Sequence, residues 1–313
     1  MFLQIILGIV GIALLYYGAE FLVKGGVRIA EALRIPSIVI GLTLVSFATG
    51  APELVVSIDA SLAGNGDISL GNVIGSNISN IGLILGVSAL IRPMIAQKTL
   101  LTFDTPMLIL ATGLLCAFCA FSHGISRLQA VVLLAVFAFY MWRTVVGALK
   151  DRSSAEEEKT GKPLPIYLAL LFVIGGVAAL IGGAKLFVNA SIYIARAFHI
   201  SDAVIGLTIV AVGTSLPELA TSAVAAYKGE NGIAVGNVIG SNIFNILAIL
   251  GIAPLIRPIA GDGIQPLDLI MICVFTLLMF VMMLIKKAVT RWGGAILLLL
   301  YVAYMALLAA RSL

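Results

Sequence analysis

Two glutamates, Glu53 and Glu218, lie deep inside long apolar runs of this 313-residue chain. An ionised carboxylate at the centre of a bilayer costs about 2.5–3.5 kcal/mol even on the lenient insertion scale. No Lys or Arg lies at the same depth in the neighbouring runs to offset that cost. Acids placed in this way are typical of a bound cation, and we expect both glutamates to serve one cation site.

Hydroxyl groups and prolines accompany the two acids. Thr49 and Thr214 each lie four residues before a glutamate, so that hydroxyl and carboxylate share a helix face, and Ser215 adds a second hydroxyl. Pro52 and Pro217 directly precede the glutamates. Because proline has no N–H, it frees the backbone carbonyl four residues earlier, and such carbonyls are good ligands for hard cations.

A second polar segment follows each acid. Ser76 and Asn80 are four residues apart, as are Ser241 and Asn245, so each pair lies on one helix face. Glycines with GxxxG spacing predict close helix contacts beside these segments: Gly71, Gly75, Gly236 and Gly240. Carboxylate, hydroxyl, amide and carbonyl groups are all oxygen donors, which suit Ca²⁺ and Na⁺ better than Zn²⁺ or Cu⁺.

The composition predicts that these groups sit in a membrane. Hydrophobic residues make up 61% of the chain and charged residues 11%, whereas soluble domains carry about 25% charged residues. This excludes most soluble enzymes and nucleic-acid binders. A spanning helix needs about 20 apolar residues, which predicts an all-α integral membrane protein with ten transmembrane helices: 2–23, 36–61, 69–90, 105–122, 126–148, 164–187, 200–226, 233–252, 267–285 and 292–310.

The chain contains an internal repeat with a constant offset of 165 residues. The matching segments are Gly18–Val23 with Gly183–Val188, Gly41–Leu54 with Gly206–Leu219, and Gly71–Gly82 with Gly236–Leu247. Each half holds five expected spans, an odd number, so the second half enters the membrane upside down. We therefore predict two inverted five-helix repeats, an architecture of secondary transporters with the substrate site at the repeat interface.

The repeat divides the chain into three parts. Residues 1–148 and 164–313 are the expected repeats, and the charged run within 149–163 is the expected cytoplasmic linker. With the N-terminus outside, 14 of the 19 Lys and Arg residues lie at cytoplasmic span ends. The positive-inside rule then predicts a multi-pass protein of the cell (inner or plasma) membrane with both termini outside.

The second-half motif Gly213–Leu219, with Gly236–Leu247 and a degenerate copy of both in the first half, resembles the sodium/calcium exchanger family of the cation/Ca²⁺ exchanger superfamily. The resemblance covers nearly all of the chain and is nearest to the compact prokaryotic type. It implies an antiporter, not an enzyme, that exchanges Ca²⁺ for Na⁺ by alternating access. The implied partners are inorganic cations and the lipid bilayer, with no cofactor and no nucleic acid; nothing in the sequence indicates a protein partner.

The resemblance also implies roles for individual residues. Ca²⁺ would lie between Glu53 and Glu218, helped by Thr49 and Thr214. The Na⁺ sites would use the same four residues together with Ser46, Ser76, Ala211, Ser215 and Ser241. The remaining residues expected to line the site are Asn80, Asn245, Pro52, Pro217 and Gly50.

Three positions depart from the family pattern. Gly50 stands where a serine hydroxyl is expected at one Na⁺ site, and Ser46 replaces an alanine whose carbonyl is a ligand. Asn245 stands where potassium-dependent relatives carry Asp, which disfavours K⁺ co-transport. Proton-coupled relatives also use two central glutamates, so a Ca²⁺/H⁺ antiporter remains the alternative.

Two other classes are disfavoured. The sequence contains neither HExxH nor GxSxG, and its histidines, His123 and His199, are expected near loops, which argues against an intramembrane hydrolase. A single central acid pair is typical of an occluding carrier site and not of the ligand rings that line channel pores.

Overall fold

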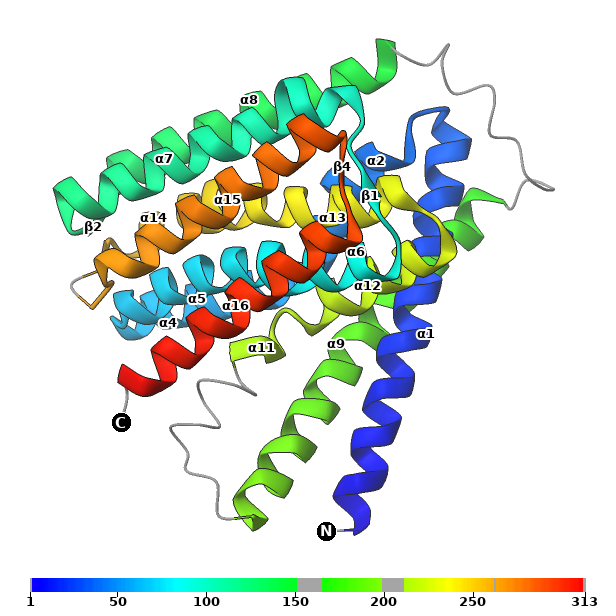
Figure 1. Cartoon of the computed structure of the whole chain (residues 1–313), viewed down its shortest axis with the longest axis horizontal. Helices are drawn as coiled ribbons and strands as arrows, with labels where there is room; N and C mark the ends of the chain where they lie inside the picture. The colour runs from blue at the N-terminus through cyan, green and yellow to red at the C-terminus, as the bar shows by residue number, and fades with distance from the viewer. Residues whose placement is uncertain (1, 151–164, 199–210, 262, 312–313) are drawn as a thin grey trace.

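The computed structural model describes residues 2–150, 165–198, 211–261 and 263–311, nearly all of them helical (Figure 1). Within these residues, eight helices are long and apolar enough to cross a membrane, and a ninth span is a helix pair, Ser37–Thr49 and Ala51–Ala63, bent by 46°. The tenth expected span, 200–226, is described only from Ala211 onward. The predicted all-α membrane fold is confirmed, and nine of the ten expected spans are found among the described residues.

The helices and strands of the first half, with η marking π-helical segments, are α1 (Phe2–Leu33), α2 (Ser37–Ile40), η1 (Gly41–Val45), α3 (Ser46–Thr49), α4 (Ala51–Ala63), α5 (Gly66–Ser79), η2 (Asn80–Leu85), α6 (Gly86–Ile91), β1 (Met94–Ile95), η3 (Leu100–Asp104), α7 (Thr105–Ser122), β2 (Gly124–Ile125) and α8 (Arg127–Lys150). The described part of the second half contains α9 (Ile166–Ala197), α11 (Ala211–Gly213), α12 (Leu216–Lys228), α13 (Asn231–Ile243), η6 (Phe244–Ile249), α14 (Leu250–Ile256), β3 (Ile259–Ala260), α15 (Pro266–Lys286), β4 (Ala288–Val289) and α16 (Arg291–Arg311). Of the expected linker 149–163, residues 151–163 lie outside the described residues.

The two first helices of the repeats, α1 and α9, are longer than their apolar runs predicted. We expected spans over 2–23 and 164–187, whereas the helices continue to Leu33 and Ala197. Hydropathy marks where a segment can cross lipid, and it does not mark where backbone hydrogen bonding ends. Figure 1 shows α1 and α9 side by side and steeply inclined to the other long helices.

Glycines bring α1 and α9 into backbone contact. A Cβ atom added at Gly176 would lie 2.7 Å from the carbonyl oxygen of Gly18, and one at Gly183 would lie 2.8 Å from that of Gly11. Higher residue numbers in α1 thus meet lower numbers in α9, so the two helices run antiparallel. Only glycine allows an approach this close.

The inverted repeat is visible in how the short strands pair. Strand β1 pairs with β4, and β2 pairs with β3, both antiparallel. Met94 faces Val289 in one pair, and Ile259 faces Ile125 in the other. Met94 and Ile259 are equivalent positions of the repeat, so exchanging the two halves maps one strand pair onto the other.

Buried tyrosine–aspartate pairs repeat the same symmetry in the last two helices of each half. The hydroxyl of Tyr140 donates to Asp104 at 3.2 Å, and that of Tyr304 donates to Asp268 at 2.8 Å. The equivalent positions here differ by 164 residues. These contacts tie α8 to the start of α7 and α16 to the start of α15.

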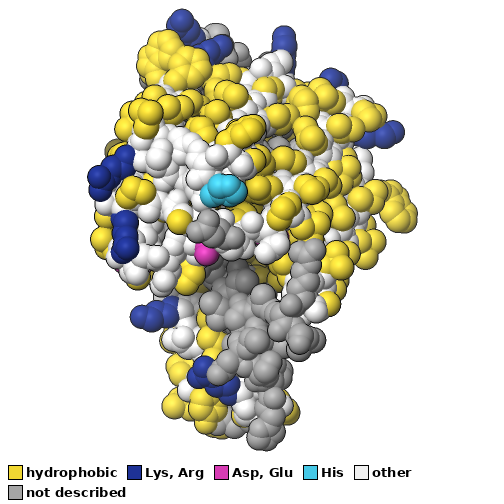
Figure 2. Space-filling view, turned by 90° about the vertical axis from the view of Figure 1, so that its left-hand side faces the viewer, with side chains coloured by type: hydrophobic (Ala, Val, Ile, Leu, Met, Phe, Trp, Pro, Cys, Tyr) yellow, Lys and Arg dark blue, Asp and Glu magenta, His cyan; other side chains and the backbone are white. Residues whose placement is uncertain are grey.

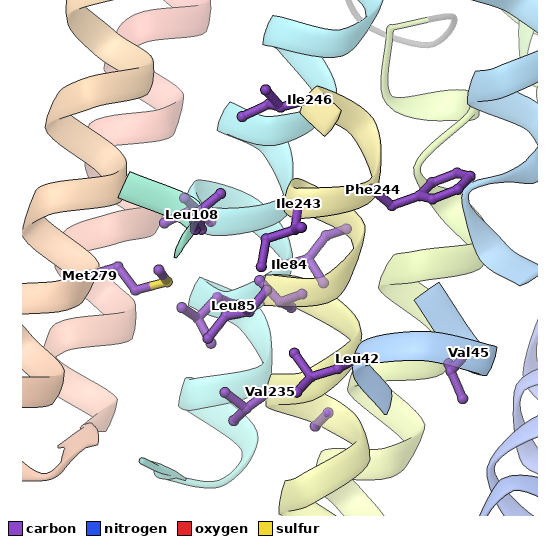
Figure 3. Close-up of a cluster of buried hydrophobic side chains, with 14 of the residues drawn as sticks. Leu42, Val45, Ile84, Leu85, Leu108, Val235, Ile243, Phe244, Ile246 and Met279 are labelled. Carbon is purple, nitrogen blue, oxygen red and sulfur yellow. The ribbon is translucent and has the colours of Figure 1, made fainter. Parts of the chain in front are cut away.

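The third span of each half forms the centre of the molecule. The described spanning helices differ in the share of their most apolar stretch that is buried inside the protein. This share is 83% for Asn231–Ile256 and 72% for Gly66–Ile91, whereas it is 22–33% for the other six long spanning helices. Leu42, Ile84 and Ile243 pack together around these central helices (Figure 3). The outer helices expose large apolar side chains, and Figure 2 shows that such side chains cover much of one face. The outer surface therefore suits contact with lipid.

The two GxxxG motifs differ in what the structure shows. Cβ atoms at Gly236 and Gly240 would lie 2.7 Å and 2.6 Å from the carbonyl oxygens of Ile38 and Leu42, as close helix packing requires. Among the described residues, nothing lies within 4 Å of a Cβ atom at Gly71 or Gly75. By the repeat, their counterpart partners would be residues 203–207, outside the described residues.

The glycine contact between α1 and α9 predicts a position-specific loss of stability. Gly176→Ala should lower the free energy of unfolding by about 1–3 kcal/mol, because the new methyl group overlaps the α1 backbone. Gly175→Ala is the matched control, since its Cβ atom meets nothing within 4 Å among the described residues. Thermal unfolding in detergent measures both variants, and equal melting temperatures would contradict this packing.

Candidate ion-binding site

The two glutamates occupy equivalent positions just after a break in a helix. Glu53 lies in the first turn of α4 and Glu218 in the first turn of α12, with Pro52 and Pro217 beside them in the same turns. Their exposed fractions are 1% and 2%. The helix breaks that the prolines predict are therefore present, and the positive end of each new helix favours a carboxylate there.

Asparagine side chains fix both broken segments in the same way. The amide of Asn72 donates to the backbone carbonyl of Glu53 at 3.1 Å and to a serine hydroxyl, Ser57, at 3.0 Å. The amide of Asn237 donates to the carbonyl of Glu218 at 3.4 Å and to Ser222, the serine equivalent to Ser57, at 2.9 Å. These bonds hold α4 to α5 and α12 to α13 at the level of the acids.

Each half of the chain places hydroxyl groups against the glutamate of the other half. Ser215 lies 3.4 Å from Oε1 of Glu53, and the hydroxyl of Thr214 also faces Glu53. Thr49 faces Glu218 and lies 3.2 Å from Oδ1 of Asn237. The two carboxylates are close enough to repel each other. Groups that are remote in sequence thus converge on one point between the repeats, as the inverted repeat predicts.

Several residues predicted to form the site carry a buried oxygen atom that has no hydrogen-bond donor. Among the described residues, these are Oε2 of Glu53, Oε2 of Glu218, Oδ1 of Asn80, Oδ1 of Asn245 and Oγ of Ser241. A buried polar atom without a partner normally costs about 1–3 kcal/mol. Several orphaned acceptors on facing helices are what a desolvated cation requires.

The asparagines lie where the central helices change their winding. Asn80 begins the π-helical segment η2, and Asn245 is the second residue of η6. Such bulges are frequent at functional sites because the extra residue re-aims the neighbouring side chains and backbone. Ser76 and Ser241 lie one turn earlier, buried on α5 and α13. The polar faces predicted from the four-residue spacing are present, whereas their π-helical winding was not predicted.

An open cavity of about 230 Å³ adjoins the site. Pro52, Thr214 and Pro217 line one side, and α9 from Ile181 to Asn189 lines the other. Thr214 lines the cavity and also faces Glu53, so the cavity lies directly beside the ion site.

Comparisons with known proteins agree with this geometry. The family model for sodium/calcium exchanger proteins matches residues 3–146 and 168–310, which covers both halves. The chain belongs to the sodium/calcium exchanger family. It is therefore a membrane antiporter of the cation/Ca²⁺ class.

Individual relatives match over almost their whole length. The putative antiporter CaxA of Alkalimonas amylolytica is 36% identical over 96% of this chain and 97% of its own. The sodium/calcium exchanger MaX1 of Methanosarcina acetivorans is 34% identical over the same shares. A structure of the sodium-calcium exchanger NCX_Mj superposes with a TM-score of 0.85 at 35% identity, covering 98% of this chain and 99% of that one.

The exchanger's departures from the family pattern now have local explanations. The Ser46 hydroxyl lies 2.5 Å from the carbonyl oxygen of Gly41 and 3.2 Å from that of Asn237, so it serves helix packing. A Cβ atom at Gly50 would lie 3.0 Å from the ring of Phe244. The equivalent positions in the other half are both serines, Ser215 and Ser79, so one side of the site has an aromatic ring where the other has hydroxyls.

Some participating residues were not predicted. Ser57 and Ser222 were missed, although each lies four residues after a glutamate and so on its helix face. Spacing alone also does not reveal that the amides of Asn72 and Asn237 bond to backbone carbonyls. Ala211 begins α11, and its side chain lies outside the described part.

Removal of one asparagine bridge should weaken the site. Asn237→Ala leaves the Glu218 carbonyl and the Ser222 hydroxyl without their shared donor, which should cost about 1–3 kcal/mol of unfolding free energy. Asn65→Ala, at an exposed amide before α5, is the control. Melting temperature and Ca²⁺ binding in detergent measure both effects, and an unchanged Asn237→Ala protein would contradict the bridging role.

Proposed function

We propose that this protein exchanges Ca²⁺ for Na⁺ by alternating access, with Ca²⁺ bound between Glu53 and Glu218. The observation that carries the proposal is that both buried glutamates and three of the polar residues predicted beside them carry oxygens without a hydrogen-bond donor. Together the ionised glutamates carry a charge of about −2, which one Ca²⁺ or two monovalent cations balance. Occupancy by one ion type then excludes the other, and exchange follows from that competition.

The proposed ligands divide between the two ions. Thr49 and Thr214 supply further oxygens for Ca²⁺ beside the carboxylates. The proposed Na⁺ ligands are the same four residues together with Ser46 and Ala211 through their backbone carbonyls, and Ser76, Ser215 and Ser241 through their hydroxyls. Asn80, Asn245, Pro52, Pro217 and Gly50 line the site. Hard cations prefer these oxygen donors, and the freed backbone of a broken helix is tolerated in a membrane where it lines such a site.

We further propose the orientation that the basic residues indicate. Residues 1–148 and 164–313 form the two repeats, 149–163 forms a cytoplasmic linker, and both termini lie outside the cell membrane. In this orientation α9 runs outward from the linker, so the stretch Ile181–Asn189 that lines the cavity lies in the half of this helix nearer the outer face. The ions would reach the site from that face in the conformation described.

Ca²⁺/H⁺ antiport is the second candidate, and Gly50 is the observation that favours it. Glu53 has the Ser215 hydroxyl within 3.4 Å, but the equivalent position facing Glu218 is Gly50. A missing hydroxyl removes one Na⁺ ligand, whereas a proton needs only the carboxylate itself. The same two glutamates would then carry Ca²⁺ and protons in turn.

Neutralising either carboxylate should abolish Ca²⁺ exchange. In Glu53→Gln and Glu218→Gln the site loses half its charge, so a divalent cation is no longer balanced. ⁴⁵Ca²⁺ uptake into proteoliposomes should fall to background, while thermal unfolding shows an intact fold because a buried uncompensated charge has been removed. Near-normal uptake by either variant would rule out the two-carboxylate site.

A serine at position 50 should strengthen Na⁺ binding. Gly50→Ser places a hydroxyl where the repeat puts that of Ser215, and one added hydrogen-bonding ligand is worth about 1 kcal/mol, or about fivefold in affinity. Gly50→Ala is the matched control, since both variants crowd Phe244 equally and only one carries a hydroxyl. The Na⁺ concentration that half-inhibits Ca²⁺ uptake measures the difference, and equal values would show that this hydroxyl is not a ligand.

A further inference from the structure

A lysine lines the cavity beside the ion site. Lys185 lies on α9 between Ala184 and Val188, and all three line the cavity opposite Thr214 and Pro217. Its side chain is exposed. A fixed positive charge is unexpected on the wall of a passage that must admit Ca²⁺, since clefts that carry cations normally have negative walls.

The inverted repeat shows how this position differs from its counterpart. The equivalent of Lys185 is Glu20 on α1, and Glu20 forms an ion pair with Lys228 of α12 at 2.6 Å. The equivalent of Lys228 is Ala63, so the repeat provides no acid for Lys185. Within the described residues, Lys185 has no carboxylate within ion-pair distance. Among the described residues, one side of the molecule therefore has a neutralised pair and the other has an ammonium group that no carboxylate faces.

Such a charge acts more strongly on Ca²⁺ than on Na⁺. The local concentration of an ion in a potential depends exponentially on its charge, so the factor for a divalent ion is the square of that for a monovalent one. At roughly 8 Å in water, one unit charge changes the concentration of a monovalent cation about twofold and that of a divalent cation about fourfold. Salt screens this effect, because the Debye length is about 8 Å at physiological ionic strength.

We propose that Lys185 is a selectivity-determining residue of the cation passage, lowering the occupancy of Ca²⁺ relative to Na⁺ from the face on which the cavity opens. This inference rests on the proposed cation exchange at Glu53 and Glu218, and it adds a control outside the binding site. The residue touches no proposed ligand, so it changes the access of ions and leaves the site unaltered. Ca²⁺ is therefore disfavoured relative to Na⁺ on this face.

The test uses ⁴⁵Ca²⁺/Ca²⁺ self-exchange by the full-length protein in proteoliposomes, which needs no Na⁺ or proton gradient. Lys185→Gln should lower the KM for Ca²⁺ about fourfold and the competitive inhibition constant of Na⁺ about twofold, with the maximal rate unchanged. Lys185→Glu should shift both further, to about 16-fold and about fourfold. All shifts should shrink when choline chloride raises the ionic strength.

Two variants separate the charge effect from other causes. Lys185→Arg keeps the charge and should match the wild type. The ammonium group of Lys24 lies over the Phe172 ring, and neither residue lines the cavity. Lys24→Gln should therefore leave the KM for Ca²⁺ and the inhibition by Na⁺ unchanged. An unchanged KM for Lys185→Gln, equal shifts for Ca²⁺ and Na⁺, or shifts insensitive to salt would each overturn the inference. Absence of any Ca²⁺ self-exchange by the wild type would instead refute the proposed function, and this inference with it.

Discussion

The structure depends on keeping two carboxylates inside a membrane with no basic partner beside them. Glu53 and Glu218 are almost fully buried, and they repel each other. Each is placed at the positive start of a helix, and each of these broken segments is held by an asparagine that bonds its backbone carbonyl. These supports reduce the cost of the two charges without neutralising them. The remaining imbalance is what a cation binding at this point would relieve.

The inverted repeat explains how one chain builds both halves of such a site. Each repeat supplies a broken helix with an acid and a central helix with amides, and the antiparallel arrangement brings the two copies face to face. The strand pairs, the asparagine bridges and the tyrosine–aspartate pairs all repeat with the same symmetry. The differences between the halves then distinguish the two sides of the membrane. Gly50 and Phe244 replace two serines near the site, and Lys185 replaces Glu20 along the passage.

The sequence predicted the parts of this arrangement that depend on local pattern. Proline before each glutamate predicted the helix breaks, and the constant offset of the repeat predicted which residues would face each other. Other features depend on tertiary packing. Asn80 and Asn245 mark the π-helical segments, but no propensity distinguishes a π-bulge from a regular turn. The amide of Asn237 on α13 bonds to the Glu218 carbonyl on α12, and its oxygen also accepts a hydrogen bond from Thr49 of the other repeat. Residue spacing within one helix does not reveal such contacts between helices. The ends of α1 and α9 were missed because a charged residue, Lys24, and polar residues, Asn189 and Ser191, lower the hydropathy without ending the helix.

The central claim, that Na⁺ and Ca²⁺ compete for one carboxylate site and so drive each other across the membrane, is tested most directly by Ca²⁺ uptake into proteoliposomes. Uptake is measured with an outward Na⁺ gradient and a protonophore present, and then with an outward proton gradient and no Na⁺. The account predicts rapid uptake in the first condition and none in the second. Uptake driven only by protons would contradict the claim of Na⁺ coupling and would assign the same two glutamates to Ca²⁺/H⁺ exchange.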